Sequence, residues 1–349
     1  MNMLKYEQLA GKLREQIMNG VFKPGDKLPS ENELTTGESL SRQTVRQALS
    51  VLEKDGLIRK HRGSGSVVIS RQKREATSHI AVITTYIGEY IFPDILRGIE
   101  QALARQGWAP TLAATHNRVD QERTILEGLI NNAVDGIIIE GTKTALPNPN
   151  IDLFRKLQAE GIPMVFINGY YPDFRPAVYV VADDRSGGIM ATVFLLDKGR
   201  RRIAGIFKSD DIQGHRRYAG YTGALRQANL PVIDDHVLWF TTETRDTLIR
   251  SNLENTLAGC DAVVCYNDEV AVQVISQARS QGVSIPAELA VISFDDSIFS
   301  NMTTPRITSL SLSKETIGRL AATKLLSLIQ GQQQTPQILN WEISEKEST

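Results

Sequence analysis

The chain has 349 residues, of which 41% are apolar and 23% charged. Domains of globular proteins typically contain roughly 100–200 residues, so this length excludes a single small module and predicts two or three domains. No apolar run approaches the roughly 18 residues that cross a bilayer, which excludes a membrane-spanning protein and favours a soluble globular one.

The N-terminal segment and the cysteines favour a cytoplasmic protein. Met1–Ala10 alternates polar and apolar residues and contains neither the apolar stretch nor the cleavage site of a secretion signal. The only cysteines, Cys260 and Cys265, are too few for a disulfide framework and lack the CxxC spacing of a zinc site. We therefore expect no metal and no cofactor.

The near-neutral total charge hides an asymmetry. Residues 1–75 contain 14 Lys and Arg against 9 Asp and Glu, whereas the remainder contains 25 against 31. Between Arg59 and Arg74 there are six basic residues and no acidic one. Such a run is typical either of a solvated linker or of a surface that binds a polyanion, and charge alone does not decide between them.

Helical signals follow one another through the basic N-terminal region. Leu9, Leu13 and Ile17 recur at helical spacing, and the predicted helix ends near Asn19-Gly20. Ser30 precedes Glu33 by three residues, which is the pattern of a capping box and predicts a second, short helix. We expect this second helix to end at Gly37.

A third helix is predicted from its cap and its apolar stripe. Ser41 occupies the N-cap position, and the apolar positions lie at Val45, Ala48, Leu49 and Leu52. The opposite face is polar and basic, with Arg42, Gln43, Arg46 and Ser50. Two short helices joined by a tight turn are typical of a helix-turn-helix, whose second helix enters the DNA major groove, where arginine can contact guanine.

A β-hairpin is predicted directly after these helices. Residues 57–61 and 66–70 have the composition of strands, and the Arg62-Gly63-Ser64-Gly65 segment joins them. The glycines permit positive φ and a close backbone approach, so Arg62 could enter the minor groove. The helices and the hairpin together predict a winged helix-turn-helix domain over residues 1–70.

This region resembles the GntR-family DNA-binding domain almost end to end. The resemblance is carried by Tyr6, Gly20, Pro24-Gly25, the segments 28–34 and 41–49, Asp55-Gly56-Leu57-Ile58 and residues 62–66. It implies that Lys5, Arg42, Arg46 and Arg62 contact DNA and that Thr44 contacts a phosphate. Gly63 and Gly65 would shape the wing.

Beyond a linker predicted at residues 71–78, short apolar strands alternate with helices. The predicted strands cover residues 80–83, 110–113, 136–139, 164–167, 203–207, 236–240, 262–265 and 290–293. Continuous apolar strands between helices predict parallel sheets covered on both faces. The expected fold class is therefore α/β, with two doubly wound lobes over residues 79–340.

Polar residues follow these strands at the edge where such sheets bind ligands. Examples are Glu140 after the third strand, Asp210 and Asp211 after the fifth, and the pairs Asn267-Asp268 and Asp295-Asp296. Carboxylates and amides beside aromatic rings are typical of a sugar site in a cleft between two lobes. Taken singly, most of these residues could equally be helix caps or turn formers.

The second region resembles the LacI/GalR-type effector-binding core, which is itself similar to periplasmic sugar-binding proteins. The matching segments are residues 89–93, 139–143, 205–211, 265–269 and 294–297. Arabinose-responsive repressors of Gram-positive bacteria join the same two modules, and the chain resembles them over nearly its whole length. The resemblance implies L-arabinose as the effector and sugar contacts from Glu89, Phe92, Lys143, Asn168, Arg217, Trp239, Asn267, Asp268 and Asp295.

Other functions are disfavoured by the sequence. The five histidines are dispersed, and no HExxH, GxSxG or Walker pattern occurs, so we do not expect an enzyme. A transport protein would share the two-lobed core but would have no reason for a winged helix. We expect a repressor that binds operator double-stranded DNA as a homodimer and is released by a small sugar. An activator, or a regulator responding to another sugar or metabolite, remains the alternative.

Overall fold

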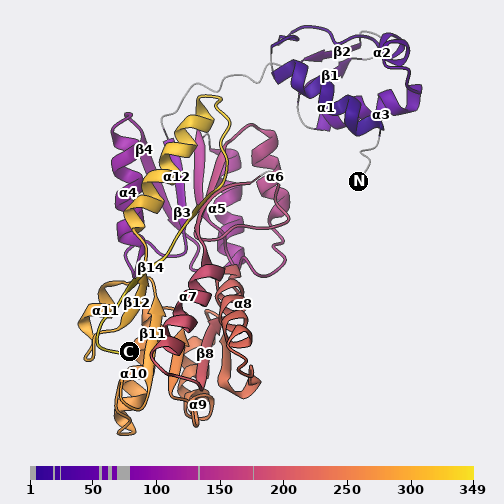
Figure 1. Ribbon diagram of the computed structural model, residues 1–349. Coiled ribbons are helices and arrows are strands. Elements are labelled where there is room, and N and C mark those ends of the chain that lie inside the picture. The colour runs from indigo at the N-terminus through magenta and orange to yellow at the C-terminus, as the bar shows by residue number, and fades with distance from the viewer. Residues whose placement is uncertain are drawn as a thin grey trace. The chain divides into compact units, whose positions relative to one another are not determined.

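The structure is a computed structural model of the full chain. It describes residues 5–349 except for residues 19, 24, 55–56, 62–64, 69–78, 133 and 176. The chain forms two compact units (Figure 1), and the described residues 5–68 belong to the first. The second contains two sheets and begins its first strand at His79. No helix in these described ranges is long and apolar enough to cross a membrane.

The first unit consists of three helices and a hairpin: α1 (Lys5–Met18), α2 (Glu31–Gly37), α3 (Arg42–Lys54), β1 (Ile58–His61) and β2 (Gly65–Val68). The capping box is confirmed, because the Ser30 backbone N–H donates to Glu33 at 2.7 Å and the Glu33 N–H donates to the Ser30 hydroxyl. Ser41 caps α3 by accepting the Thr44 N–H at 3.2 Å. The predicted apolar stripes are buried together in one core, formed by Leu9, Leu13, Val45, Ala48, Leu49 and Leu52 with residues of the hairpin.

The hairpin is antiparallel, as predicted. Ile58 pairs with Val68 and His61 with Gly65, and an isolated bridge joins Lys27 to Val67. Ile58 and Val68 are buried against the helices, which fixes the hairpin on the helical layer. The predicted contact residues Arg62 and Gly63 lie outside the described residues.

The first lobe of the second unit contains a six-stranded sheet with the order β13-β7-β6-β5-β3-β4. Its strands are β3 (His79–Thr84), β4 (Ala109–Ala114), β5 (Gly136–Glu140), β6 (Met164–Ile167), β7 (Val178–Ala182) and β13 (Gln337–Leu339). All neighbouring pairs are parallel. The helices of this lobe are α4 (Phe92–Ala104), α5 (Val119–Asn131), α6 (Ile151–Ala159) and α12 (Lys314–Ile329).

The second lobe repeats this arrangement with the order β14-β12-β11-β10-β8-β9. Its strands are β8 (Ile203–Lys208), β9 (Val237–Phe240), β10 (Ala262–Cys265), β11 (Ala290–Phe294), β12 (Thr308–Ser311) and β14 (Glu342–Ser344), of which β14 alone pairs antiparallel. The helices are α7 (Asp184–Asp197), α8 (Ile212–Gln227), α9 (Arg245–Leu257), α10 (Asp268–Ser280) and α11 (Ile298–Met302), with the 3-10 turn η1 (Asp234–His236). Apolar side chains on each face of this sheet form a separate core, one with α7 and α8 and the other with α9 and α10. The two doubly wound lobes are therefore confirmed.

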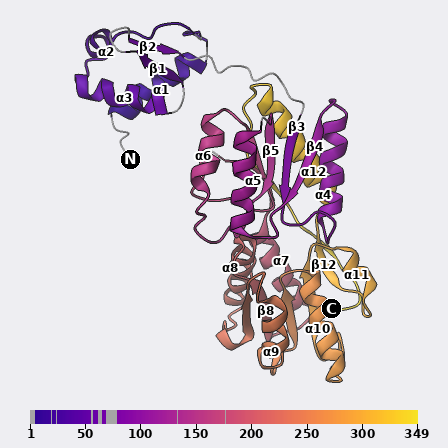
Figure 2. The ribbon, with the colours of Figure 1, turned by 180° about the vertical axis from the view of Figure 1, so that it is seen from behind.

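The chain passes between the lobes three times in the described core: from β7 to α7, from β12 to α12 and from β13 to β14 (Figures 1 and 2). Four of these strands, β7, β12, β13 and β14, were not predicted from the sequence. The packed core also continues past the predicted boundary at residue 340. Ser348, for example, is buried and donates to the Val291 carbonyl at 2.6 Å.

Glycines allow the helices of each lobe to approach closely. A Cβ on Gly318 of α12 would lie 2.0 Å from the Ile95 carbonyl oxygen of α4, and a Cβ on Gly98 would lie 2.2 Å from the Glu315 carbonyl oxygen. Such distances are far below van der Waals contact, so only glycine permits this backbone-to-backbone packing. Helix α12 follows the chain's second passage between the lobes, so its packing on α4 fixes this returning segment to the first lobe.

We expect Gly318→Ala to destabilise the core by roughly 1–3 kcal/mol, because the added methyl group must push two helices apart. The matched control is Gly128→Ala in α5, where a Cβ would meet nothing within 4 Å. That variant should be neutral or more stable by about 0.5–1 kcal/mol. Urea unfolding of the full chain measures both changes, and equal stability of the two variants would contradict the tight α4–α12 contact.

Candidate functional site

The carboxyl ends of the strands of both lobes enclose a cavity of about 170 Å³. From the first lobe it is lined by residues after β3, β5 and β6: Thr85, Tyr86, Glu89, Tyr90, Ile91, Phe92, Glu140 and Asn168. From the second lobe it is lined by residues in and after β8, β9, β10 and β11: Lys208, Asp211, Gln213, Arg217, Phe240, Thr242, Arg245, Tyr266, Asn267, Glu269 and Asp295. The cavity is therefore at the position where parallel sheets bind ligands.

Arg217, on α8, is the largest fully buried side chain of the site. Its Nε donates to Asp184 Oδ1 at 2.9 Å, its Nη1 donates to the Tyr266 carbonyl at 2.5 Å, and its Nη2 lies 3.6 Å from Asp295 Oδ1. The guanidinium also lies 4.2 Å from the Phe294 ring centroid and 5.3 Å from that of Trp341. Burial raises the pKa of the Asp184 carboxyl to about 6 despite this guanidinium, whose charge favours the ionised form.

Asp295 presents its carboxylate to the cavity from an unusual backbone conformation. Its φ is 92°, a region that favours glycine. The Tyr90 hydroxyl, from the other lobe, donates to Asp295 Oδ2 at 2.6 Å. Tyr90 and Arg217 thus hold the two carboxylate oxygens from opposite sides, and burial raises the pKa of the Tyr90 phenol well above its usual value.

A second carboxylate, Glu140, is held on the first-lobe side. Its Oε1 accepts the Asn168 amide N–H at 2.8 Å and its Oε2 accepts the Thr85 backbone N–H at 2.9 Å. Burial raises the pKa of Glu140, while these two donors act in the opposite direction. Asn168 itself adopts a φ of 59°.

Each cation in the lining has a carboxylate partner. Lys208 lies 2.6 Å from Asp211, and Arg245 lies 3.2 Å from Glu269. Burial disfavours the Lys208 ammonium, but the charges of Asp211 and Asp210 raise its pKa above its usual value. With Arg217 also paired, the lining offers, among the residues that the structure describes, no free cation for a phosphate or carboxylate ligand. Its acceptors and aromatic rings instead suit a neutral molecule with several hydroxyl groups.

The first unit presents a basic face of its own. Lys5, Arg42 and Arg46 are exposed, Arg42 and Arg46 lie on α3, and Thr44 is half-buried beside the Ser41 cap. Arg46 Nε lies 2.8 Å from Glu31 Oε2 on α2. Because exposed ion pairs contribute only about 0–1 kcal/mol, this pair is readily exchanged for another partner. Gly65 is exposed at the base of the hairpin tip with a φ of 89°.

Comparison with known proteins decides the family. Residues 5–68 match the model of the bacterial regulatory proteins of the gntR family, and residues 192–349 match the periplasmic binding protein-like domain. Two relatives, each named arabinose metabolism transcriptional repressor, come from Geobacillus stearothermophilus and Halalkalibacterium halodurans. They are 38% and 34% identical to this chain, and the alignments cover 93% of this chain and 91% and 89% of the relatives. The chain belongs to this family of transcriptional repressors.

Solved structures agree with the fold of the repressor. The transcriptional regulator CelR in complex with cellobiose matches with a TM-score of 0.71 at 23% identity, over 92% of this chain and 95% of that chain. The transcription regulator CcpA of Lactococcus lactis matches with a TM-score of 0.69 at 26% identity, over 78% of this chain and 98% of that one.

Most of the sugar contacts implied by the sequence resemblance meet in the repressor's cavity. The structure brings together Glu89, Phe92, Asn168, Arg217, Asn267 and Asp295 in its lining. Lys143, Trp239 and Asp268 lie outside the lining. Trp239 packs on Phe207, Tyr218 and His215, and the next residue of β9, Phe240, lines the cavity instead.

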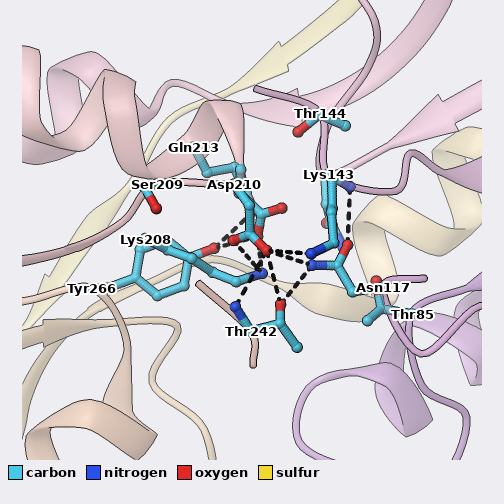
Figure 3. A network of polar contacts seen from close by, with 12 residues as sticks. Thr85, Asn117, Lys143, Thr144, Lys208, Ser209, Asp210, Gln213, Thr242 and Tyr266 are labelled. Atoms are coloured by element: carbon cyan, nitrogen blue, oxygen red, sulfur yellow. Dashed lines mark hydrogen bonds and ion pairs between the residues drawn. The ribbon is translucent and has the colours of Figure 1, made fainter. Parts of the chain in front are cut away.

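Lys143 and Asp268 have partners elsewhere. Lys143 Nζ lies 2.5 Å from Glu243 in a polar network beside the cavity (Figure 3). The Asp268 carboxylate is buried and accepts hydrogen bonds from the hydroxyls of Ser293, Ser297 and Ser309 and from the Ser297 N–H. Burial raises the pKa of Asp268 to about 6. The structure therefore makes Asp268 a support for the segment that carries Asp295.

Several lining residues were missed by the sequence analysis. Tyr266 and Glu269 flank the pair Asn267-Asp268, and Arg245 begins the helix after β9. The same signal, a position just past a parallel strand, applies to Tyr266 and Glu269. Arg245 was missed because four residues separate it from the end of β9, further than the strand-end rule reaches.

Within the described residues, no group of three or more His, Cys, Asp or Glu side chains is arranged to hold a metal ion.

We expect Asp268→Ala to lower the unfolding free energy of the repressor by roughly 2–4 kcal/mol, because it leaves several buried donors without an acceptor. Asp197→Ala, at an exposed position on the last residue of α7, is the control and should change stability by less than about 0.5 kcal/mol. Urea unfolding distinguishes them. Unchanged stability with a lost response to the effector would instead make Asp268 a direct ligand contact.

Proposed function

We propose that this repressor binds operator DNA as a homodimer in the cytoplasm and that a small neutral sugar, L-arabinose, releases it. The observation that carries the proposal is the polar cavity between the lobes, in which carboxylates and amides face inward and each cation is already paired. The cavity of about 170 Å³ is smaller than the roughly 300–1,000 Å³ of sites for drug-sized ligands, which favours a monosaccharide. The names of the two relatives support arabinose.

The proposed sugar contacts are Glu89, Phe92, Asn168, Arg217, Asn267 and Asp295, and we add Lys208, Asp211, Arg245, Tyr266 and Glu269 from the lining. Because these residues come from both lobes, sugar binding favours the closed form. The DNA contacts proposed are Lys5, Arg42, Thr44 and Arg46, together with Arg62, Gly63 and Gly65 of the wing. Linkage then requires that operator DNA weaken sugar binding by the same factor by which sugar weakens DNA binding.

We expect Asp295→Asn to occupy the operator normally but to require at least about tenfold more arabinose for release, since a hydrogen bond to a charged group contributes roughly 1.5–3 kcal/mol. Asparagine is chosen because it tolerates the positive φ of this position. The control is Asp235→Ala, at an exposed position before β9. Fluorescence anisotropy of labelled operator, titrated with arabinose, xylose, galactose and a sugar phosphate, measures the release.

Equal release of wild type and Asp295→Asn would eliminate Asp295 from the sugar site. Release by another sugar but not by arabinose would change the effector, and tighter DNA binding in the presence of sugar would reverse the sign of the mechanism.

The homodimer is proposed to form through one side of the core. Three apolar residues of α11 are exposed: Ile298 (65%), Met302 (72%) and Phe299. Leu112 of the edge strand β4 is exposed as well. Both views place β4 of the first lobe and α11 of the second along the same side of the core (Figures 1 and 2). A second copy packed there by two-fold symmetry would match the two half-sites of a symmetric operator.

The variant Ile298→Asp/Met302→Asp should therefore be monomeric and bind operator DNA much more weakly, because it places charges in the proposed interface. Ile233→Asp, at an exposed apolar position in the loop before β9, is the matched control and should stay dimeric. Sedimentation velocity measures both. A dimeric double variant would place the interface elsewhere, and a strictly monomeric wild type that binds a palindromic operator tightly would overturn the homodimer.

A further inference from the structure

A cluster of polar side chains joins the two lobes beside the cavity (Figure 3). At its centre is Asp210, which follows β8 in the second lobe and is 1% exposed. Its Oδ2 accepts the Nδ2–H of Asn117, from the first lobe, at 3.1 Å. The same oxygen accepts the backbone N–H and the hydroxyl of Thr242, both at 3.2 Å. A buried carboxylate of one lobe is thus satisfied in part by the other lobe.

The first-lobe side of this interlobe cluster is held in shape by its own contacts. Asn117 has a φ of 54°, its Oδ1 accepts the Lys143 backbone N–H at 2.9 Å, and its Nδ2 also donates to the Thr242 hydroxyl at 2.5 Å. The Lys143 ammonium lies 3.6 Å from Asp210 and 2.5 Å from Glu243. Asn117 and Lys143 therefore reach the second lobe as one preformed pair.

Backbone groups add to the same contact. The Ala145 N–H donates to the Asp210 carbonyl at 3.2 Å, and the Ile212 N–H donates to the Thr144 hydroxyl at 3.0 Å. These contacts join the loop after β5 to the segment between β8 and α8. Opening the lobes would break all of them, so these protein contacts stabilise the closed arrangement.

The interlobe cluster is connected to the cavity through Lys208. This ammonium lies 3.5 Å from Asp210 Oδ1 and 2.6 Å from Asp211, and Asp211 in turn accepts the Tyr266 hydroxyl at 3.1 Å. Lys208, Asp211 and Tyr266 line the cavity, whereas Asn117, Lys143 and Asp210 do not. Asp210 Oδ2 therefore accepts hydrogen bonds from Asn117 and Thr242, and Asp210 Oδ1 lies near the cavity residue Lys208.

We propose that Asp210 is a positioning residue that couples lobe closure to the effector cavity: its contact with Asn117 stabilises the closed form of the core and holds Lys208 in the place where it meets the sugar. This inference rests on the proposed sugar-binding function. The apparent affinity for a ligand that needs the closed form is its intrinsic affinity reduced by the fraction of closed molecules. The cluster thus raises sugar affinity without touching the sugar.

Asn117 is the residue to change, because it lies outside the cavity lining. Asn117→Gly removes the interlobe donor and is compatible with the positive φ. Asn117→Asp is isosteric and keeps the acceptor for Lys143, but it places a second acceptor against Asp210. The matched control is Asn229→Gly, since Asn229 has a φ of 57° and is exposed after α8. Thermal unfolding verifies that each variant is folded.

The closure of the lobes is measured on the full chain by double electron–electron resonance. Spin labels at Gln121→Cys on α5 and Glu254→Cys on α9, both exposed positions, report the interlobe distance in a Cys260→Ser background. Without sugar, wild type and Asn229→Gly should show a larger fraction of the short, sugar-bound distance than the two Asn117 variants. With saturating arabinose, the variants should return to the short distance.

Arabinose binding, measured by calorimetry, should weaken in the order wild type, Asn117→Gly, Asn117→Asp, with a loss of roughly fivefold or more for the last. The proposal is overturned if the unliganded wild type is as open as Asn117→Asp, or if both variants keep the wild-type distance and affinity. Failure of the wild type to bind any tested sugar would refute the proposed function instead. The sugar-free distances would still decide whether the interlobe cluster closes the core.

Discussion

The buried guanidinium of Arg217 is the interaction on which the effector core depends. A charge taken out of water is tolerated only with good partners, and Arg217 has Asp184, the Tyr266 carbonyl and Asp295 around it and aromatic rings on its faces. These partners come from the start of α7, the end of β10 and the end of β11, and Trp341 comes from the third passage between the lobes. One side chain therefore ties together the segments that form the second-lobe half of the cavity.

The same requirement shapes the chemistry of the cavity. Arg217, Lys208 and Arg245 each form an ion pair with a carboxylate of the protein. Their positive charges are therefore already neutralised before a ligand binds. What remains for a ligand is a set of oriented acceptors, amide groups and rings, of which Asp295 and Asn168 are held by strained backbones. Such a lining suits the proposed neutral sugar, whose hydroxyl groups can pair with oriented acceptors.

Contacts between the lobes occur on two sides of the cavity. Tyr90 reaches from the first lobe to Asp295, and Asn117 reaches to Asp210. Both pairs use a neutral donor on the first lobe and a buried carboxylate on the second. The carboxylates are costly to bury unpaired, so each pair favours closure, and the three chain passages limit how the lobes can move apart.

The sequence by itself determined the elements whose signals are local. The caps at Ser30 and Ser41, the apolar stripe through Val45 and Leu49, and the buried strand predicted at 136–139 depend on neighbours a few residues away, and all were predicted. The family also followed from the sequence, because its motifs are contiguous. Position past a parallel strand, together with the family resemblance, predicted Asn168, Asn267 and Asp295, which line the cavity.

Only the tertiary structure decided what depends on distant partners. The short strands β12, β13 and β14 contain few apolar residues and are stabilised by sheet neighbours far away in the chain, so local pattern did not reveal them. The choice of Phe240 over Trp239, and the burial of Asp268 beneath three serines, depend on strand rotation and helix placement. The pairing of Tyr90 with Asp295 joins residues 205 positions apart, and no local signal encodes a contact that exists only when two lobes close.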